Sequence, residues 1–167
     1  SRRIVGFEAL ARWAHPVTGF IPPDKFIPVA EELGQMELLW RRLFGGACRD
    51  ALTWPDDVTL SFNFSPSQLS DRRFAGKVLS ILSNTGLPAH RLEAEITENA
   101  IVTDIDATRH AIETLRNSGV RIVIDDFGTG YSSLSYLRTF PFDKIKIDKS
   151  FVGEMPERAE CVAIVDA

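Results

Sequence analysis

Segments with a strand pattern alternate with segments with a helix pattern along most of this chain. The strand-like segments span residues 3–10, 58–64, 92–97, 120–125 and 144–147. The helix-like segments span about residues 24–33, 36–52, 72–84 and 104–117, and a short helical piece is expected at 134–137. Repeated strand–helix units form a parallel sheet in α/β proteins. The alternation therefore predicts an α/β domain whose strands run side by side in one direction.

The strands carry polar residues on one side, and this favours a barrel over an open sheet. Apolar and polar side chains alternate in each strand, and the polar side presents Glu8, Asn63, Glu95, Asp125 and Lys146. An open sheet covered by helices would bury that side at a high free-energy cost. In a TIM-type (β/α)8 barrel the same side can point inward, near the C-terminal mouth where active sites lie. An antiparallel sheet with one wet face is the alternative, which the intervening helices oppose.

The length limits how much of a barrel can be present. The chain has 167 residues, whereas eight β/α units usually take about 250 residues and rarely fewer than 200. About five units are recognisable, so we expect one modified barrel domain over residues 1–167 that is truncated at both ends.

Turn and cap signals mark the helix boundaries. A turn is expected at 15–19, Asp24 can cap the first helix, and Gly34 follows the end of that helix. Inside the second helix, Gly45 and Gly46 either weaken the helix by roughly 1 kcal/mol each or allow a neighbouring element to pack closely.

Composition excludes several classes of partner. The net charge of −4 argues against binding to a nucleic-acid polymer or directly to a membrane surface, because both favour a basic patch. No apolar run approaches the ~20 residues of a membrane span. The two cysteines, Cys48 and Cys161, form no metal or disulfide motif. A reducing, cytoplasmic location is therefore expected.

The stretch 120–146 contains the strongest chemical signal. A β-branched strand ends in Asp125 and Asp126, a glycine-containing turn follows, and a second strand brings in Lys146. Hard divalent cations bind carboxylate and amide oxygens, and a pair of ions about 3.5–4 Å apart needs a carboxylate that serves both. The alternative is an Asx turn at a strand end, with Gly128 and Gly130 supplying positive φ.

A series of motifs resembles the EAL domain family of cyclic di-GMP phosphodiesterases. They occur in the family's order and cover essentially the whole chain: Glu8-Ala9-Leu10 followed by Ala-Arg-Trp, Pro22 to Pro28, Asn63-Phe64-Ser65, Glu95-Ile96-Thr97-Glu98, Asp125 to Leu134, and Lys146-Ile147-Asp148. The first tripeptide alone would carry no weight, but the complete series is highly specific.

The resemblance implies a modified (β/α)8 barrel that uses two Mg²⁺ or Mn²⁺ ions to hydrolyse cyclic di-GMP to linear pGpG in bacterial signal transduction. By position, the implied metal ligands are Glu8, Asn63, Glu95, Asp125 and Asp126, and the implied catalytic residues are Lys146, Glu8 and Asp125.

The resemblance also implies residues that bind substrate and residues that hold a loop. Arg12, Leu10 and Asp148 would contact the substrate, although Arg12 could instead pair with a surface carboxylate. Glu98, Thr97, Gly128 and Thr129 would anchor the loop after Asp126, through which the family forms homodimers.

Family elements that would precede Ser1 or follow Ala167 are absent from this sequence. They include the first strand and a late catalytic glutamate, so we expect the 167-residue chain alone to be inactive and the complete domain to be an enzyme. The intact protein is expected to carry sensory or GGDEF domains, as a cytoplasmic protein or as the cytoplasmic part of a membrane-anchored one. The alternatives are a non-catalytic cyclic di-GMP receptor or protein-interaction module, and a different metal-dependent hydrolase.

Overall fold

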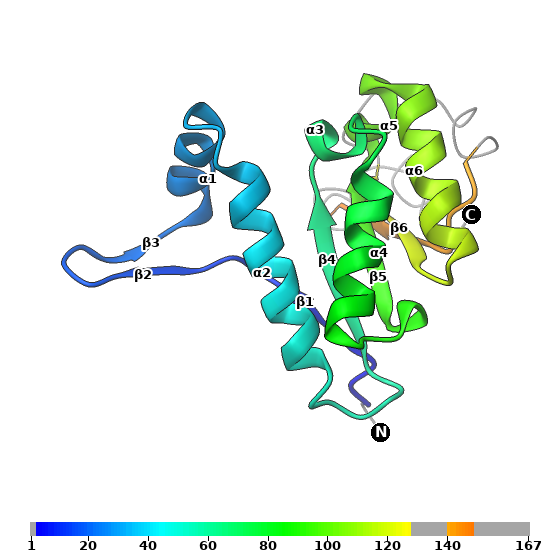
Figure 1. Cartoon of the computed structure of the whole chain (residues 1–167), viewed down its shortest axis with the longest axis horizontal. Helices are drawn as coiled ribbons and strands as arrows, with labels where there is room; N and C mark the ends of the chain where they lie inside the picture. Colours follow the sequence, from blue (N-terminus) through cyan, green and yellow to red (C-terminus); the bar gives the residue numbers. More distant parts are fainter. Residues whose placement is uncertain (1–2, 128–139, 149–167) are drawn as a thin grey trace, which may run out of the picture.

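A five-stranded parallel sheet forms the centre of the molecule (Figure 1). The computed structural model describes residues 3–127 and 140–148. The strand order is β1-β4-β5-β6-β7, so these strands lie side by side in the order of the chain. Their bounds are Gly6–Ala9, Thr59–Phe64, Leu92–Thr97, Arg121–Phe127 and Lys144–Ile147. All four pairings are parallel, which confirms the predicted α/β arrangement and excludes the antiparallel alternative for these strands.

Three long helices cover one face of the sheet, as Figure 1 shows for α2 (Met36–Ala51), α4 (Phe74–Thr85) and α6 (Ile105–Asn117). The apolar sides of the central strands pack against these helices to form the core. Aromatic rings join the helices to the sheet in edge-to-face contacts. The ring centroids of Phe44 of α2 and Phe62 of β4 are 5.0 Å apart, as are those of Phe74 of α4 and Phe64 of β4. Because the helices cover the apolar side, the polar side of the strands faces the other way.

Within the residues that the structure describes, the other helices are α1 (Pro23–Glu32), α3 (Pro66–Leu69), α5 (Glu98–Thr103) and the 3₁₀ turn η1 (Ala89–Arg91). Pro22 is the N-cap of α1, so the prediction that Asp24 caps this helix is wrong: Asp24 lies in the first turn. Proline at the first helical position needs no hydrogen-bond partner and already has a helical φ. Gly34 has φ +64°, as expected for the residue after a helix. Within the described ranges, no helix has both the length and the apolar character required to cross a bilayer.

A hairpin of two short strands and one helix were not anticipated from the sequence. The segment predicted only as a turn at 15–19 joins two short antiparallel strands, β2 (Trp13–His15) and β3 (Gly19–Ile21). His15 Nδ1 accepts the backbone N–H groups of Val17 and Thr18 at 3.2 Å each, which closes this hairpin. Helix α5 begins directly at the end of β5, where no helix was expected. The predicted helical piece at 134–137 lies outside the described residues.

Glycine plays different parts in β1 and α2. A Cβ atom on Gly6 would lie 2.5 Å from Thr59 Oγ1 and 3.0 Å from Thr59 O, so β1 can approach β4 only because this residue has no side chain. A Cβ on Gly45 would make ordinary contacts, and a Cβ on Gly46 would meet nothing within 4 Å. Close packing therefore does not require the glycine pair in α2, and the helix-weakening interpretation holds.

Gly6→Ala is expected to lower the free energy of unfolding of the intact protein by about 1–3 kcal/mol, because the new methyl group overpacks the β1–β4 pairing. Gly46→Ala is the matched control and should raise the free energy of unfolding by up to about 1 kcal/mol through better helix propensity. Denaturant titration measures both changes. Equal stability of Gly6→Ala and the unmodified protein would contradict the packing argument.

Candidate active site

Each of the five parallel strands contributes one polar side chain to a cluster near its C-terminal end. These residues are Glu8 on β1, Asn63 on β4, Glu95 on β5, Asp125 on β6 and Lys146 on β7. Asn63 on β4 is directly opposite Glu95 on β5. Two residues further along β5, Thr97 is opposite Asp125 on β6. Parallel strands end at the same edge of a sheet, so residues that are far apart in the sequence meet there. The polar side chains predicted to share one side thus form one site.

Lys146 lies among three carboxylates of this cluster. Its Nζ atom is in ion-pair contact with Oε1 of Glu95, 3.7 Å from Oε2 of Glu8 and 3.9 Å from Oδ2 of Asp125. Asn63 Nδ2 donates a hydrogen bond of 2.8 Å to Glu8 Oε1, which ties the cluster to β4. The ammonium group therefore neutralises part of a site whose other charged members are acidic.

Glu95 is the most buried member of the cluster, with 0% of its surface exposed. Neither of its carboxylate oxygens has a well-formed hydrogen bond with a described residue, although Oε1 pairs with Lys146. Burial raises the pKa of Glu95, and the contact with Lys146 offsets only part of that effect. A buried carboxylate with so few donors has unused capacity to bind a cation.

The same surroundings disfavour the charged form of Glu95 but favour the charged form of Lys146. Burial by itself would lower the pKa of Lys146, but the contact with Glu95 and the charges of Asp125 and Glu8 outweigh it, so the pKa is raised. Because a lysine already titrates near 10.4 in isolation, this side chain is a cation at neutral pH.

Asp126 departs from the predicted geometry. The sequence predicts a strand over residues 120–125, but β6 continues to Phe127. Asp126 has φ +54°, at the place where the β6–β7 register is irregular, and its N–H donates to Oδ1 of Asp125 at 3.0 Å. The left-handed conformation turns one residue out of the strand alternation, so two adjacent aspartates can be presented at one strand end. Gly128 and Gly130, which the Asx-turn alternative invoked, lie outside the described residues.

The other predicted site residues are distributed around this cluster. Leu10 is 55% exposed after β1, and the exposed Arg12 donates from its guanidinium to Ala11 O at 2.9 Å. In the described part of the chain, no ion pair or hydrogen bond joins Arg12 to the cluster. Together with burial and the charge of Asp125, the negative charge of Asp148 raises the pKa of Asp126. The backbone N–H of Asp148 donates to Phe127 O at 3.4 Å.

Of the residues predicted to anchor the loop after Asp126, the structure describes Thr97 and Glu98. Thr97 is the N-cap of α5, and Glu98 lies in the first turn of that helix, so Glu98 is not a residue of an irregular loop. Both side chains are half-buried. Gly128 and Thr129 lie outside the described residues. The proposed contact between Glu98 and the loop after Asp126 stays a prediction.

The donor set suits a hard divalent cation in chemical type. The ligand atoms would be oxygens, which Mg²⁺ and Mn²⁺ prefer. They come from four carboxylates and one amide: Glu8, Glu95, Asp125, Asp126 and Asn63. Among residues 3–127 and 140–148, no three acidic, histidine or cysteine side chains are already arranged as a metal site. In the arrangement described, the ammonium group of Lys146 occupies the position between Glu8, Glu95 and Asp125.

The comparison with known proteins identifies the family. The family model described as the EAL domain matches residues 1–167. This chain belongs to the EAL domain family. It is 48% identical over 165 residues to uncharacterized protein y4lL of Sinorhizobium fredii, covering 99% of this chain and 20% of that protein. It is 40% identical over 164 residues to the cyclic di-GMP phosphodiesterase NbdA of Pseudomonas aeruginosa, covering 96% of this chain and 21% of that protein.

A solved phosphodiesterase structure has the same fold. The structure of the PaMucR phosphodiesterase in complex with c-di-GMP matches this chain with a TM-score of 0.87 and 37% identity, over 98% of this chain and 68% of that chain. The prediction of an incomplete TIM-type (β/α)8 barrel is thereby confirmed. The chain spans about a fifth of the two curated relatives named above. The predicted truncation at both ends stays a prediction.

A second polar layer lies next to the cluster in this chain and was not among the predicted site residues. Glu93, two residues before Glu95, is 6% exposed and contacts Lys144, which is two residues before Lys146. Ser61, two residues before Asn63, donates to Glu93 Oε2 at 3.3 Å. A period of two along each strand places these residues on the same side as the cluster. That periodicity was the signal that could have revealed them.

Asp126→Asn is expected to stabilise the metal-free protein at neutral pH. Burial raises the pKa of Asp126, and the neighbouring charges of Asp125 and Asp148 raise it further, so the ionised form is disfavoured in the folded state. The cost is present above the raised pKa and disappears below the ordinary value near 3.8. Asparagine removes the charge and is well suited to positive φ.

The measurement is the thermal midpoint of the metal-free protein at pH 7 and at pH 3.5, or the lowest pH at which it remains folded. The variant should melt at a higher temperature than the unmodified protein at pH 7, and the difference should shrink as the pH falls. A gain that is independent of pH would show that backbone preference, and not charge, is responsible.

Proposed function

We propose that the intact protein containing this chain hydrolyses cyclic di-GMP to linear pGpG, using two Mg²⁺ or Mn²⁺ ions. The observation that carries the proposal is the convergence of Glu8, Glu95 and Asp125 on Lys146 at the C-terminal edge of a parallel sheet. Membership of the EAL family, the name of NbdA and the ligand of the PaMucR structure support the choice of substrate.

The oxygen-rich cluster would hold the metal ions. Glu8, Glu95, Asp125 and Asp126 supply carboxylates, and Asn63 supplies an amide oxygen because its Nδ2 already donates to Glu8. When bound, a pair of divalent ions lowers the pKa of a coordinated water and offsets negative charge on a phosphate. The burial of Glu95 keeps its carboxylate short of other donors, which favours its use as a ligand.

Lys146 would act as a fixed positive charge. The pKa of Lys146 is raised, so the ammonium group keeps its proton at neutral pH. It can donate hydrogen bonds to a phosphate oxygen and stabilise charge that develops there. Its ion pairs with carboxylates from β1, β5 and β6 hold the long side chain toward the site.

The remaining assignments complete the proposal. Arg12, Leu10 and Asp148 contact the substrate, and the loop after Asp126 contributes to a homodimer. The intact protein also carries sensory or GGDEF domains and works in the cytoplasm. The relatives are about five times as long as this chain, which leaves ample sequence for such domains.

Asp125→Asn in the intact protein is expected to lower kcat for cyclic di-GMP by more than about a hundredfold, because even residues that merely support metal ligands cost about 10–100-fold when changed. The substitution keeps the size of the side chain and removes its charge. Hydrolysis is followed by chromatography of pGpG in the presence of Mg²⁺ or Mn²⁺, and metal affinity by calorimetry. Glu113→Gln, which removes a charge from the exposed side of α6, is the matched control and should leave both unchanged.

Two outcomes would contradict the proposal. Normal turnover by Asp125→Asn would remove this residue from the metal site. An intact protein that binds cyclic di-GMP without hydrolysing it, with either metal, would be a receptor, the alternative function. The 167-residue chain alone is expected to be inactive in the same assay.

A further inference from the structure

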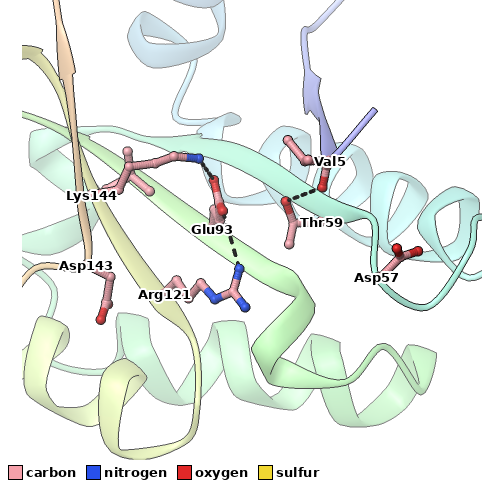
Figure 2. Close-up of a pocket in the computed structure, with 8 residues that line it drawn as sticks. Val5, Asp57, Thr59, Glu93, Arg121, Asp143 and Lys144 are labelled. Carbon is pink, nitrogen blue, oxygen red and sulfur yellow. Dashed lines mark hydrogen bonds and ion pairs between the residues drawn. The ribbon is translucent and has the colours of Figure 1, made fainter. Parts of the chain in front are cut away.

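A second ion-pair layer lies beneath the proposed site, toward the N-terminal ends of the strands. Glu93 Oε2 is 2.9 Å from Lys144 Nζ and accepts a hydrogen bond of 3.3 Å from Ser61. Its Oε1 is 3.7 Å from the guanidinium of Arg121. Figure 2 shows Arg121 of the adjacent strand β6 and Lys144 of β7, one strand further on, both reaching Glu93. The Glu93 side chain is only 8% exposed, whereas those of Lys144 and Arg121 are each 51% exposed.

Both layers contain an ion pair between a glutamate of β5 and a lysine of β7. Glu93 pairs with Lys144, and Glu95 pairs with Lys146, with a spacing of two residues on both strands. Because β6 lies between β5 and β7, each pair reaches across β6, where Val123, which is opposite both Glu95 and Lys144, is apolar and buried. Two strand spacings amount to about 10 Å, which only long side chains can bridge.

The backbone alone holds Lys146 weakly. Lys144 is opposite Val123 and Ile145 is opposite Ile124, but the next paired residues are Ile147 and Phe127, so the register shifts at the level of Lys146. Lys146 therefore emerges where the β6–β7 ladder is interrupted. The last regularly paired residue on its side of the strand is Lys144, whose side chain is held by Glu93.

We propose that Glu93 and Lys144 are positioning residues for Lys146: their ion pair holds β7 just before the irregularity and so sets where the ammonium group of Lys146 enters the acidic cluster. This inference rests on the proposed function only for its catalytic consequence. The pair with Lys144 matters because the Glu93 side chain is almost fully buried, and loss of Lys144 leaves its carboxylate only Arg121 at 3.7 Å and the hydroxyl of Ser61.

The test compares Glu93→Gln, Lys144→Met and the double variant with the unmodified intact protein. Arg116→Met is the matched control, because Arg116 pairs with Asp143 at 3.1 Å beside the start of β7 without touching the polar layers. Two quantities are measured. The first is the titration of the Lys146 ammonium in metal-free protein by NMR of labelled lysine, assigned with Lys146→Met. The second is kcat and KM for cyclic di-GMP.

Both single variants should shift the Lys146 midpoint toward the ordinary lysine value and lower kcat about 10–100-fold, with little change in KM. The double variant should be no worse than the more impaired single variant, because both changes remove one interaction. Lys144→Arg keeps the charge and should retain most of the unmodified kcat. Arg116→Met should lower stability without moving the Lys146 titration.

An unchanged Lys146 titration in Glu93→Gln and Lys144→Met would overturn the inference, as would an equal shift in Arg116→Met. If the intact protein hydrolyses no cyclic di-GMP, the proposed function fails, and the NMR titration still decides whether this ion pair positions Lys146. If Glu93→Gln fails to fold, Lys144→Met and Lys144→Arg carry the same comparison, since Lys144 is half-exposed.

Discussion

The gathering of acidic side chains at the C-terminal ends of the parallel strands, with Glu95 fully buried, is the constraint on which the site depends. Parallel pairing brings Glu8, Glu95 and Asp125 to this edge, and Asp126 joins them through its left-handed backbone. The raised pKa values of Glu95 and Asp126 show that their ionised forms are disfavoured there, through burial in both cases and through neighbouring acidic charge at Asp126. Positive charge is therefore required, and Lys146 supplies part of it. A site that still favours additional positive charge is suited to divalent cations and an anionic phosphodiester.

Hydrophobic packing on the other side of the same strands offsets the free-energy cost of the acidic cluster. Leu60, Ile96 and Ile124 alternate with the polar residues and pack under α2, α4 and α6, where the aromatic contacts join strand to helix. The hydrophobic free energy gained there is large enough to hold strands whose other side carries like charges. In this chain, the helix-covered side of the sheet supplies the apolar core, and the other side carries the polar cluster.

Sequence patterns predicted much of this arrangement because strand periodicity is a local property. Strands 92–97 and 144–147 were predicted with the observed limits, and the five polar residues that meet in the cluster were placed on one side. The short elements were missed for a physical reason. The β2–β3 hairpin and α5 have three to six residues each, too few for a periodic pattern to be distinguishable. Their formation depends on local contacts, such as the two hydrogen bonds to His15, and on the strand that precedes α5.

The sequence by itself determined which residues could share a side of each strand and which chemical groups were available, because alternation and residue type are written in the chain. Only the tertiary structure decided the order of the strands, their parallel register and hence that Lys146 faces carboxylates more than 50 residues away in the chain. It also decided that Asp126 adopts positive φ within β6 and that Glu93 pairs with Lys144 across an intervening strand. These features depend on pairing between distant segments, which no local pattern specifies.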